Sequence, residues 1–388
     1  MRVLHVIPSI DPRDGGPTVA VASMATATAV AGADVHVVTT RGEDSQFEAG
    51  RALIDLDSVT LHAFRRSPPD MFKMSWAMAG WLWKNVERFN VLHLHAAFSL
   101  STAVGAHIAW LKRVPYVLRP LGTLDPWSLR EKRWKKVLYY RLVEKATLIR
   151  ASAIHATSRL EHEGIASLGF ADKTFVIPLG VSQTRRAAGT SCDHDRPLRL
   201  LFVGRLHPHK GLLLLLDAVK VLKDRRMPFA LRIAGQGTQA YRRELVELCH
   251  TRGLGQHVSF LGHITGRDKD EQYAWADALV LPSFHENFGI AAAEAMSAGL
   301  MVVVTDRVGL AEVVSRWQAG IVVPCISDAL SEALRSLGDN RESCVTMSKR
   351  ASEAAIAEFS WAAISQELLA MYNGIAQRTQ SRKGTFAS

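Results

Sequence analysis

Two glutamates stand eight residues apart in PSFHENFGIAAAEAMSAG, the stretch that covers residues 282–299. Glu286 lies in a polar loop, and Glu294 lies in an alanine-rich segment that favours a helix. The backbone amides of residues 288–290, at the start of that helix, could bind a phosphate with the help of the helix dipole. The pattern therefore predicts an anion site with a carboxylate on either side.

The two carboxylates suit sugar hydroxyls, because a carboxylate accepts hydrogen bonds and can accept two from a vicinal diol. Glu294 is expected little more than one turn into the helix, within reach of a ribose joined to the bound phosphate. Glu286 lies on the loop beside that phosphate. A ligand with a sugar, a diphosphate and a ribose in a row fits this order, and such a ligand is a nucleotide sugar.

Basic residues follow the strand expected at 199–204. Arg205 comes directly after it, and Lys210 opens the next helix. Cations at the carboxyl end of a parallel strand fit an anionic ligand such as a diphosphate, with a purely structural role as the alternative.

Glycines occur at two further strand ends. Gly15 and Gly16 precede Pro17 in the first strand–helix turn, and Gly235 lies in IAGQG at 233–237. Such glycines let backbone amides approach a phosphate closely, although a tight turn alone would also explain them. The first turn lacks GxGxxG, which argues against an enzyme that binds NAD.

A histidine stands at the carboxyl end of the strand expected at 91–96. His95 is predicted to face the ligand, but His93 lies two residues earlier and shares its face of the strand. The choice between the two histidines stays open.

Strands and helices alternate along the whole chain, which is typical of parallel sheets covered by helices on both faces. The strands are predicted at 2–8, 34–40, 58–64, 91–96, 116–120, 153–157, 174–178, 199–204, 229–234, 257–261, 278–282, 301–305 and 320–323. Ligands of such sheets bind at the carboxyl ends of the strands, where the residues described above are found.

The chain is expected to form two domains. The predicted bounds are 1–182 for an N-terminal domain, 183–197 for a linker, 198–358 for a C-terminal domain, 359–377 for a helix returning to the first domain and 378–388 for a flexible tail. The linker prediction rests on a polar composition without periodicity.

Three blocks, VGRLHPHKG, ADALVLPSFHENFGIAAAEAMSAGLMVV and GLAEVV, resemble glycosyltransferase family 4, which comprises retaining enzymes of the GT-B fold. The match covers most of 198–315 and is looser in the first half. The resemblance implies an α/β architecture of two doubly wound, Rossmann-like domains facing a central cleft. It also implies transfer of a sugar from a UDP- or GDP-sugar to an acceptor hydroxyl.

The resemblance assigns roles to particular residues. The expected catalytic residues are Glu286, His95, Arg205 and Lys210. The expected donor-binding residues are Gly16, Gly235, Ile264, Asn287, Phe288, Gly289, Ile290 and Glu294. Gly15 and Arg119 are expected to bind the acceptor, which belongs to the first half of the chain.

No metal or cofactor is expected, because basic residues and helix dipoles stabilise the leaving diphosphate in this fold. The DxD-like triplets at 55–57 and 193–195 do not end well-marked core strands. Two alternatives stay open: a GT-B epimerase acting on a nucleotide sugar, and a catalytically silent subunit that binds one.

The net charge of +10 points to a negatively charged partner, and much of it lies in 129–150, with eight Lys or Arg against two Glu. Apolar residues at spacings of three and four make this segment a basic amphipathic helix. They are Trp134, Leu138, Leu142, Ala146 and Ile149. The segment is expected either to pack on the domain with its basic side in solvent, to dock on anionic lipid, or to steer a phosphate-bearing substrate.

We expect a cytoplasmic enzyme, peripheral on the inner membrane face, that acts on a glycan or lipid-linked sugar in bacterial surface polysaccharide synthesis. Nucleic acid is not an expected partner, because no known binding module accompanies the charge. The uncharged stretch 91–111 is interpreted as a strand and a helix, and the N-terminus as a strand and not a signal peptide. Four cysteines without CxxC spacing favour a reducing compartment.

Overall fold

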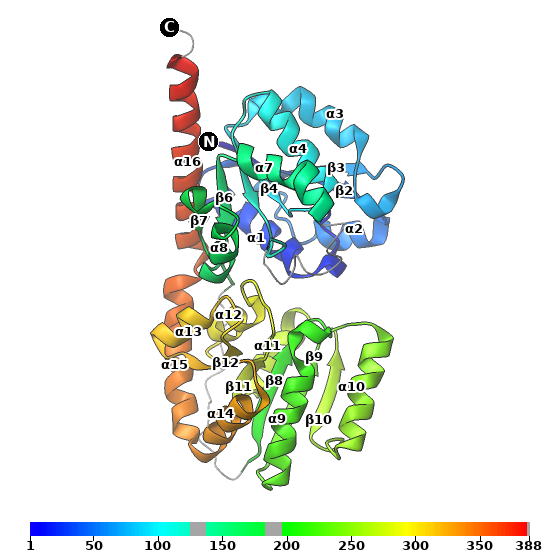
Figure 1. The fold of residues 1–388 in the computed structure, drawn as a ribbon, viewed down its shortest axis with the longest axis vertical. Helices are drawn as coiled ribbons and strands as arrows, with labels where there is room; N and C mark the ends of the chain where they lie inside the picture. Colours follow the sequence, from blue (N-terminus) through cyan, green and yellow to red (C-terminus); the bar gives the residue numbers. More distant parts are fainter. Residues whose placement is uncertain (125–136, 183–195, 386–388) are drawn as a thin grey trace. The chain divides into compact units, whose positions relative to one another are not determined.

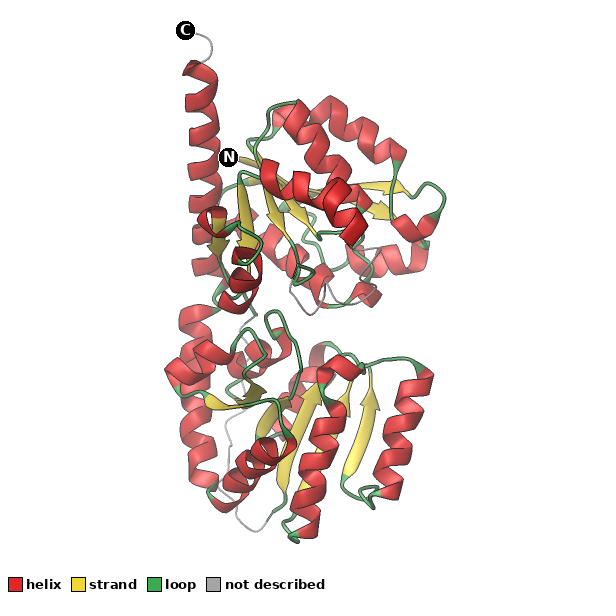
Figure 2. Ribbon diagram, viewed as in Figure 1, coloured by secondary structure: helices red, strands yellow, loops and turns green. Residues whose placement is uncertain are grey.

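The computed structural model describes residues 1–124, 137–182 and 196–385. The chain divides into two compact units (Figure 1), one formed by Met1–Gly180 with Trp361–Ser388 and the other by Val181–Ser360. Each unit is a parallel sheet with helices packed on it (Figure 2), as the strand–helix alternation predicts. The sequence prediction of an α/β, GT-B type architecture is confirmed.

The first unit contains a seven-stranded sheet in the order β3-β2-β1-β4-β5-β6-β7. The strands are β1 Arg2–Ile7, β2 Asp34–Arg41, β3 Val59–Arg65, β4 Val91–His95, β5 Tyr116–Arg119, β6 Ala153–Ala156 and β7 Thr174–Val176. The strand order reverses on either side of β1, so the carboxyl ends of β1 and β4 lie next to each other at a topological switch point.

The helices of this unit bury apolar faces against the sheet. They are α1 Gly16–Val30, α2 Asp44–Arg51, α3 Trp76–Asn85, α4 Leu100–Leu111, α7 Lys145–Arg150, α8 Arg159–Ala166 and α16 Trp361–Thr385. Met78 and Leu82 of α3 and Ala106 of α4 belong to one core cluster with Leu92 and Leu94 of β4.

The second unit contains a six-stranded sheet in the order β10-β9-β8-β11-β12-β13. Its strands are β8 Leu198–Val203, β9 Phe229–Ala234, β10 Val258–Gly262, β11 Ala278–Leu281, β12 Met301–Thr305 and β13 Gly320–Val323. Its helices are α9 Leu212–Asp224, α10 Gln239–Thr251, α11 Gly266–Trp275, α12 Ile290–Ser297, α13 Ala311–Trp317, α14 Ser327–Asp339 and α15 Arg341–Glu358.

Every predicted strand is present, with ends shifted by at most two residues. The C-terminal helix was predicted to end at 377, but α16 continues to Thr385. The helix is therefore longer than predicted, and the flexibility of the tail stays a prediction. Residues 183–195 of the predicted linker 183–197, and residues 129–136 of the basic segment 129–150, lie outside the described residues.

The last part of the basic segment differs from the packed helix that was considered. A π-helical turn at Tyr140–Glu144 leads into α7, and Leu138, Leu142 and Ile149 are exposed. The buried residues are Glu144, Thr147 and Leu148. Leu138, Leu142 and Ile149 of the predicted apolar stripe therefore face solvent, whereas Trp134 lies outside the described residues.

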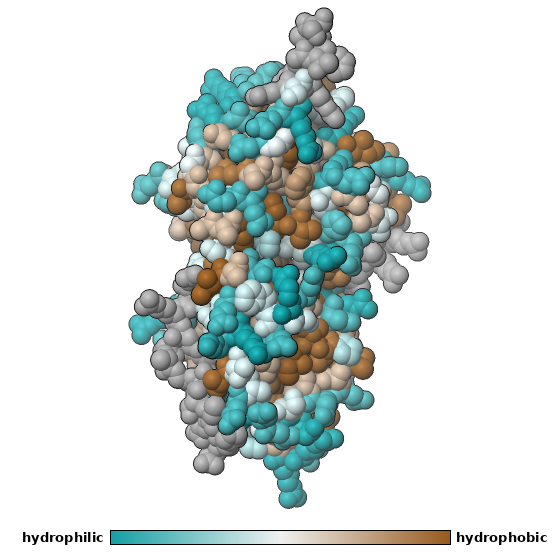
Figure 3. Space-filling model, turned by 90° about the vertical axis from the view of Figure 1, so that its left-hand side faces the viewer, coloured by the Kyte–Doolittle hydropathy of each residue, from teal (hydrophilic) through white to brown (hydrophobic). Residues whose placement is uncertain are grey.

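Polar and apolar side chains are mixed on the face of the molecule that Figure 3 shows. Exposed single apolar residues such as Val176 and Ile356 are ordinary on a folded protein. No helix within the described ranges has the length and hydrophobicity needed to cross a membrane.

Candidate functional site

The loop after β8 reaches the end of β11 because of a glycine. Gly211 has a φ of 70°, and a Cβ there would lie 1.8 Å from the carbonyl oxygen of Pro282. Only glycine permits this left-handed backbone and this close approach. The turn places Lys210 beside Glu286, and the two side chains form an ion pair. Two predicted catalytic residues therefore meet.

Glu286 also joins two loops through its backbone. Its N–H donates to the carbonyl of Arg307 over 3.0 Å, and its carbonyl accepts from the N–H of Gly309 over 2.8 Å. The side chain is 19% exposed. The carboxylate is therefore held by the loop after β12 and by Lys210 while one side stays open to a ligand.

The start of α12 has the geometry of an anion site. Gly289 precedes it with a φ of 98°, and the amides of residues 288–290 donate no hydrogen bond within the described parts of the chain. Phe288 buries its ring against Phe359, with centroids 5.7 Å apart, so only its backbone can meet a ligand. Asn287 is half-buried in the loop before it.

Glu294 has two partners that the sequence did not reveal. Lys269 Nζ donates to Oε1 over 2.7 Å, and the hydroxyl of Tyr273 donates to Oε2 over 3.0 Å. Both side chains come from α11, where their spacing of four puts them on one helix face. Burial, together with the charge of Glu294, raises the pKa of Tyr273, so its hydroxyl stays a donor.

The remaining predicted donor residues lie at neighbouring strand ends. Gly235, with a φ of 147°, packs against Gly204, and its N–H donates to the carbonyl of Gly262 over 2.7 Å. Ile264 is half-buried in the turn that follows β10. Arg205 is exposed and forms no ion pair among the residues described. Its guanidinium is therefore available to an anion.

The first unit carries an unexpected stripe of polar side chains. Strand residues alternate between sheet faces, and Leu92 and Leu94 pack with α3 and α4 on one face. The opposite face of β1, β4, β5 and β6 carries His5, His93, His95, Arg119 and His155, each at most 2% exposed. Only His93, His95 and Arg119 were singled out from the sequence, because the pairing of four distant strands assembles the stripe.

A chain of hydrogen bonds fixes the tautomers of two histidines. The carbonyl of Ile177 can only accept, so His155 Nε2 donates to it over 2.7 Å. His155 Nδ1 then accepts from His93 Nε2 over 3.3 Å, and His93 Nδ1 accepts from the hydroxyl of Tyr372 over 2.7 Å. Tyr372 belongs to α16, so the returning helix completes the chain.

His95 lies inside this stripe. Its Nε2 is 2.9 Å from His5 Nδ1, and its ring lies 4.2 Å from that of His93. His95 Nδ1 and His5 Nε2 have no hydrogen-bond partner in the part of the chain that the structure describes. The ring has no exposed surface, so its assignment as a catalytic residue stays a prediction.

Arg119 is equally enclosed. It lies beside His95 in the sheet register, is 2% exposed, and its Nε and Nη1 atoms have no hydrogen-bond partner among residues 1–124, 137–182 and 196–385. Burial lowers the pKa of Arg119 to about 10, against the opposing influence of Glu161. The predicted role in acceptor binding stays a prediction.

Three histidines of the stripe could in principle share a metal. Nitrogen atoms of His5, His93 and His95 lie within 4.8 Å of one another. Both nitrogens of His93 already serve the hydrogen-bond chain to Tyr372 and His155. A metal would have to break that chain, so these residues do not fit an ion as they are arranged.

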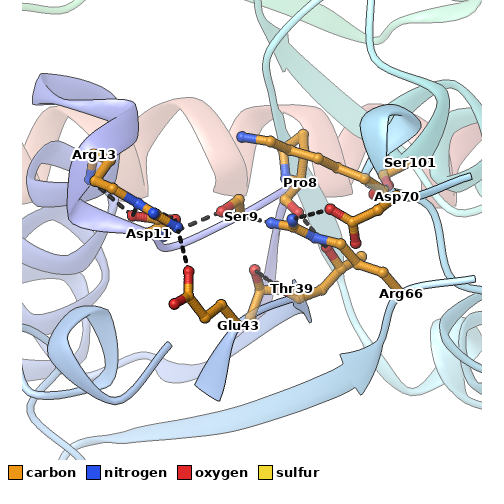
Figure 4. Close-up of polar contacts among 11 residues, drawn as sticks. Pro8, Ser9, Asp11, Arg13, Thr39, Glu43, Arg66, Asp70 and Ser101 are labelled. Atoms are coloured by element: carbon orange, nitrogen blue, oxygen red, sulfur yellow. Dashed lines mark hydrogen bonds and ion pairs between the residues drawn. The ribbon is translucent and has the colours of Figure 1, made fainter. Parts of the chain in front are cut away.

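The glycine turn after β1 begins with Gly15, whose φ of 83° and ψ of −146° require glycine. Gly16 is exposed at the first position of α1. Figure 4 shows polar contacts among residues near the end of β1, and the sequence did not predict these contacts.

Arg66 joins the loop after β1, the end of β2 and the helical turn at Asp70–Phe72 (Figure 4). Its guanidinium donates to Ser9 Oγ and Thr40 Oγ1, each over 3.1 Å, and to Asp70 over 3.0 Å. Nothing in the sequence around Arg66 distinguishes it from the exposed arginines nearby.

Two families match this chain. Residues 15–180 match the glycosyl transferase 4-like domain, and residues 193–354 match glycosyl transferases group 1. An uncharacterised glycosyltransferase of Methanocaldococcus jannaschii is 30% identical over 314 residues, covering 74% of this chain and 76% of that protein. The chain belongs to glycosyltransferase family 4. The predicted enzyme class, a glycosyltransferase, is confirmed.

Other relatives of this glycosyltransferase extend over nearly the whole chain. A D-inositol 3-phosphate glycosyltransferase of Corynebacterium glutamicum is 26% identical over 406 residues, covering 96% of each protein. The crystal structure of Anabaena HepE in complex with UDP and glucose has a TM-score of 0.76 at 20% identity, over 96% of this chain and 100% of that one. The latter likeness establishes the GT-B fold.

We expect Tyr372→Phe to lower the free energy of unfolding by about 1–3 kcal/mol, because His93 Nδ1 would stay buried without its donor. Urea denaturation measures the change. Tyr139→Phe in the same unit is the matched control, since the buried hydroxyl of Tyr139 has no hydrogen-bond partner among the described residues. Equal losses in the two variants would refute the role of the hydrogen-bond chain.

Acidification should destabilise the glycosyltransferase. Burial lowers the pKa of His5 and of His155 from 6.5 to about 3, and those of His93 and His95 also fall well below 6.5. Below pH 6.5 these histidines become protonated in the unfolded chain, whereas they stay neutral in the folded protein. The free energy of unfolding should therefore fall by about 1.4 kcal/mol per pH unit for each histidine.

Urea titrations between pH 7 and pH 5 test this expectation, because carboxylates of ordinary pKa stay ionised over most of that range. Glu144 is the exception, since burial raises its pKa to about 7 and its protonation in the folded state offsets the contribution of one histidine. In the His5→Gln variant, the free energy of unfolding should fall less steeply with decreasing pH, by the contribution of one histidine. A stability that does not change with pH over this range would contradict the prediction.

Proposed function

We propose that this glycosyltransferase is a retaining enzyme that moves a sugar from a UDP- or GDP-sugar to an acceptor hydroxyl. The observation that carries the proposal is the unbonded start of α12, flanked by Glu286 with Lys210 and by Glu294 with Lys269. The structural likeness to HepE, whose structures hold UDP with glucose and UDP-glucose, supports a nucleotide-sugar donor.

The diphosphate would lie at the start of α12. Negative charge grows on the departing phosphate oxygen, and Arg205, Lys210 and the amides of residues 288–290 are arranged to stabilise it. Lys210 is paired with Glu286. When the donor diphosphate binds Lys210, the Glu286 carboxylate can accept hydrogen bonds from the donor sugar instead.

Glu294 would hold the ribose. Lys269 and Tyr273 occupy one lone pair on each of its oxygens, and a carboxylate has further lone pairs that can accept a vicinal diol. The two donors fix the carboxylate in place before the ligand arrives, which reduces the entropy lost on binding.

Retention of the anomeric configuration could arise in two ways. Glu286 could act as a nucleophile, as carboxylates do in retaining glycosidases, or the acceptor could attack from the face that the diphosphate leaves. We favour same-face attack, following the family resemblance. A trapped sugar ester on Glu286, detected by mass spectrometry, would overturn that preference.

For the acceptor we propose a lipid-linked glycan of bacterial surface polysaccharide synthesis, with Gly15 and Arg119 among the contacts and the enzyme at the inner face of the cytoplasmic membrane. The relatives named above include an inositol phosphate glycosyltransferase, and other curated relatives are glycogen synthases. Product analysis is therefore needed to identify the acceptor.

A thermal-shift screen of UDP-, GDP- and ADP-sugars tests the donor. Binding to the folded state alone adds about 2.7 kcal/mol of stability at a hundred times Kd, so the true donor should raise Tm most. Product analysis then separates three outcomes. Transfer requires an acceptor, an epimerase converts the sugar nucleotide without one, and a silent subunit yields no product.

Glu294→Ala should mainly weaken donor binding, while Glu286→Ala should mainly lower kcat. The reason is that Glu294 contacts the ribose that stays, whereas Glu286 contacts the sugar that is transferred. Donor Kd by calorimetry and kcat by product formation separate the two effects. Lys269→Met removes a hydrogen-bond donor of Glu294 and leaves Glu286 unchanged. It should therefore weaken donor binding, as Glu294→Ala does. Identical kinetic defects in the two alanine variants would contradict this division.

A further inference from the structure

Helices α3 and α4 of the first unit expose tryptophans on the side away from the sheet. Trp76 and Trp83 of α3 are 69% and 48% exposed, and Trp110 of α4 is 44% exposed. The opposite sides of both helices are buried, with Met78 and Leu82 in the core. A large part of each of these tryptophan rings is therefore left in solvent by the fold.

These side chains form one connected surface. Lys112 follows the last residue of α4, and its Nζ lies 4.6 Å from the ring centroid of Trp83 on α3. Arg150 of α7 lies 3.8 Å from the ring centroid of Trp110 on α4. The two cation–π contacts join the outer sides of the three helices, which lie side by side in Figure 1.

The segment that leads through α7 extends the apolar surface. Leu138, Leu142 and Ile149 are 53%, 70% and 57% exposed. Together with Trp76, Trp83 and Trp110 they present large apolar groups from three helices.

Charge on these helices is strongly one-sided. The stretches 76–88, 100–113 and 137–150 carry seven cations, namely Lys84, Arg88, Lys112, Arg113, Arg141, Lys145 and Arg150. They carry two carboxylates, Glu87, which pairs with Lys112, and Glu144, which is buried. The surface is therefore both apolar and positive.

We propose that the outer sides of α3, α4 and α7 form a surface that docks on an anionic lipid bilayer. Tryptophan prefers the boundary between headgroups and acyl chains, leucine enters the acyl region, and each Lys or Arg near an anionic membrane contributes about 1 kcal/mol. An acidic protein would satisfy the charges but would not require exposed leucines between them. The surface would hold the enzyme next to a lipid-linked acceptor, yet its existence does not depend on the proposed transfer.

Vesicle co-sedimentation with the full-length protein tests the proposal. Wild type should bind phosphatidylcholine vesicles that contain phosphatidylglycerol, bind much less to phosphatidylcholine alone, and lose binding as salt rises. The triple variant Trp76→Ser, Trp83→Ser and Leu142→Ser should reduce binding at least about tenfold, as should Arg141→Glu with Lys145→Glu. Unchanged binding in both variants would overturn the proposal.

Ile326→Ser with Ile356→Ser is the matched control, since both residues are exposed apolar side chains of the second unit, and vesicle binding should be unchanged. Donor-induced shifts in Tm should persist in every variant, which shows that the protein is folded and separates this test from that of the proposed function. Wild type that self-associates without vesicles, and variants that do not, would assign the surface to a second copy and refute the membrane proposal.

Discussion

The close approach of Gly211 to the carbonyl of Pro282 is the contact on which the anion site in the second unit depends. It brings the loop after β8 against the end of β11, and so places Lys210 beside Glu286. A side chain at 211 would push these strand ends apart. The charges and the unbonded amides at the start of α12 then lie within one small region, where they strengthen one another at an anionic ligand.

The first unit depends on a different constraint, the need to satisfy buried polar groups. A sheet face that carries four histidines and an arginine is costly unless the rings stay neutral and hydrogen-bonded. The carbonyl of Ile177 and the hydroxyl of Tyr372 meet that need for His155 and His93. Within the described residues, the atoms of His95 and Arg119 that lack partners lie at the carboxyl ends of β4 and β5, where α/β sheets bind their ligands. His5, which also has an atom without a partner, lies beside them two residues before the end of β1.

Local patterns were enough to predict most of the fold. Apolar runs bounded by turn residues marked every strand, and the left-handed glycine before α12 marked a helix start beside Glu286. The segment 137–150 showed a clear periodicity, but periodicity alone cannot tell whether an apolar stripe faces the core or the solvent.

The sequence by itself determined the alternation of strands and helices, the residues around the start of α12 and the family to which the enzyme belongs. These depend on neighbours within a few residues along the chain. Only the tertiary structure showed that Lys269 and Tyr273 hold Glu294, that Arg66 joins the loop after β1 to β2 and to the turn at Asp70–Phe72, and that Tyr372 completes the histidine chain. Each of these contacts joins elements far apart in sequence, and strand order and helix packing decide which side chains meet.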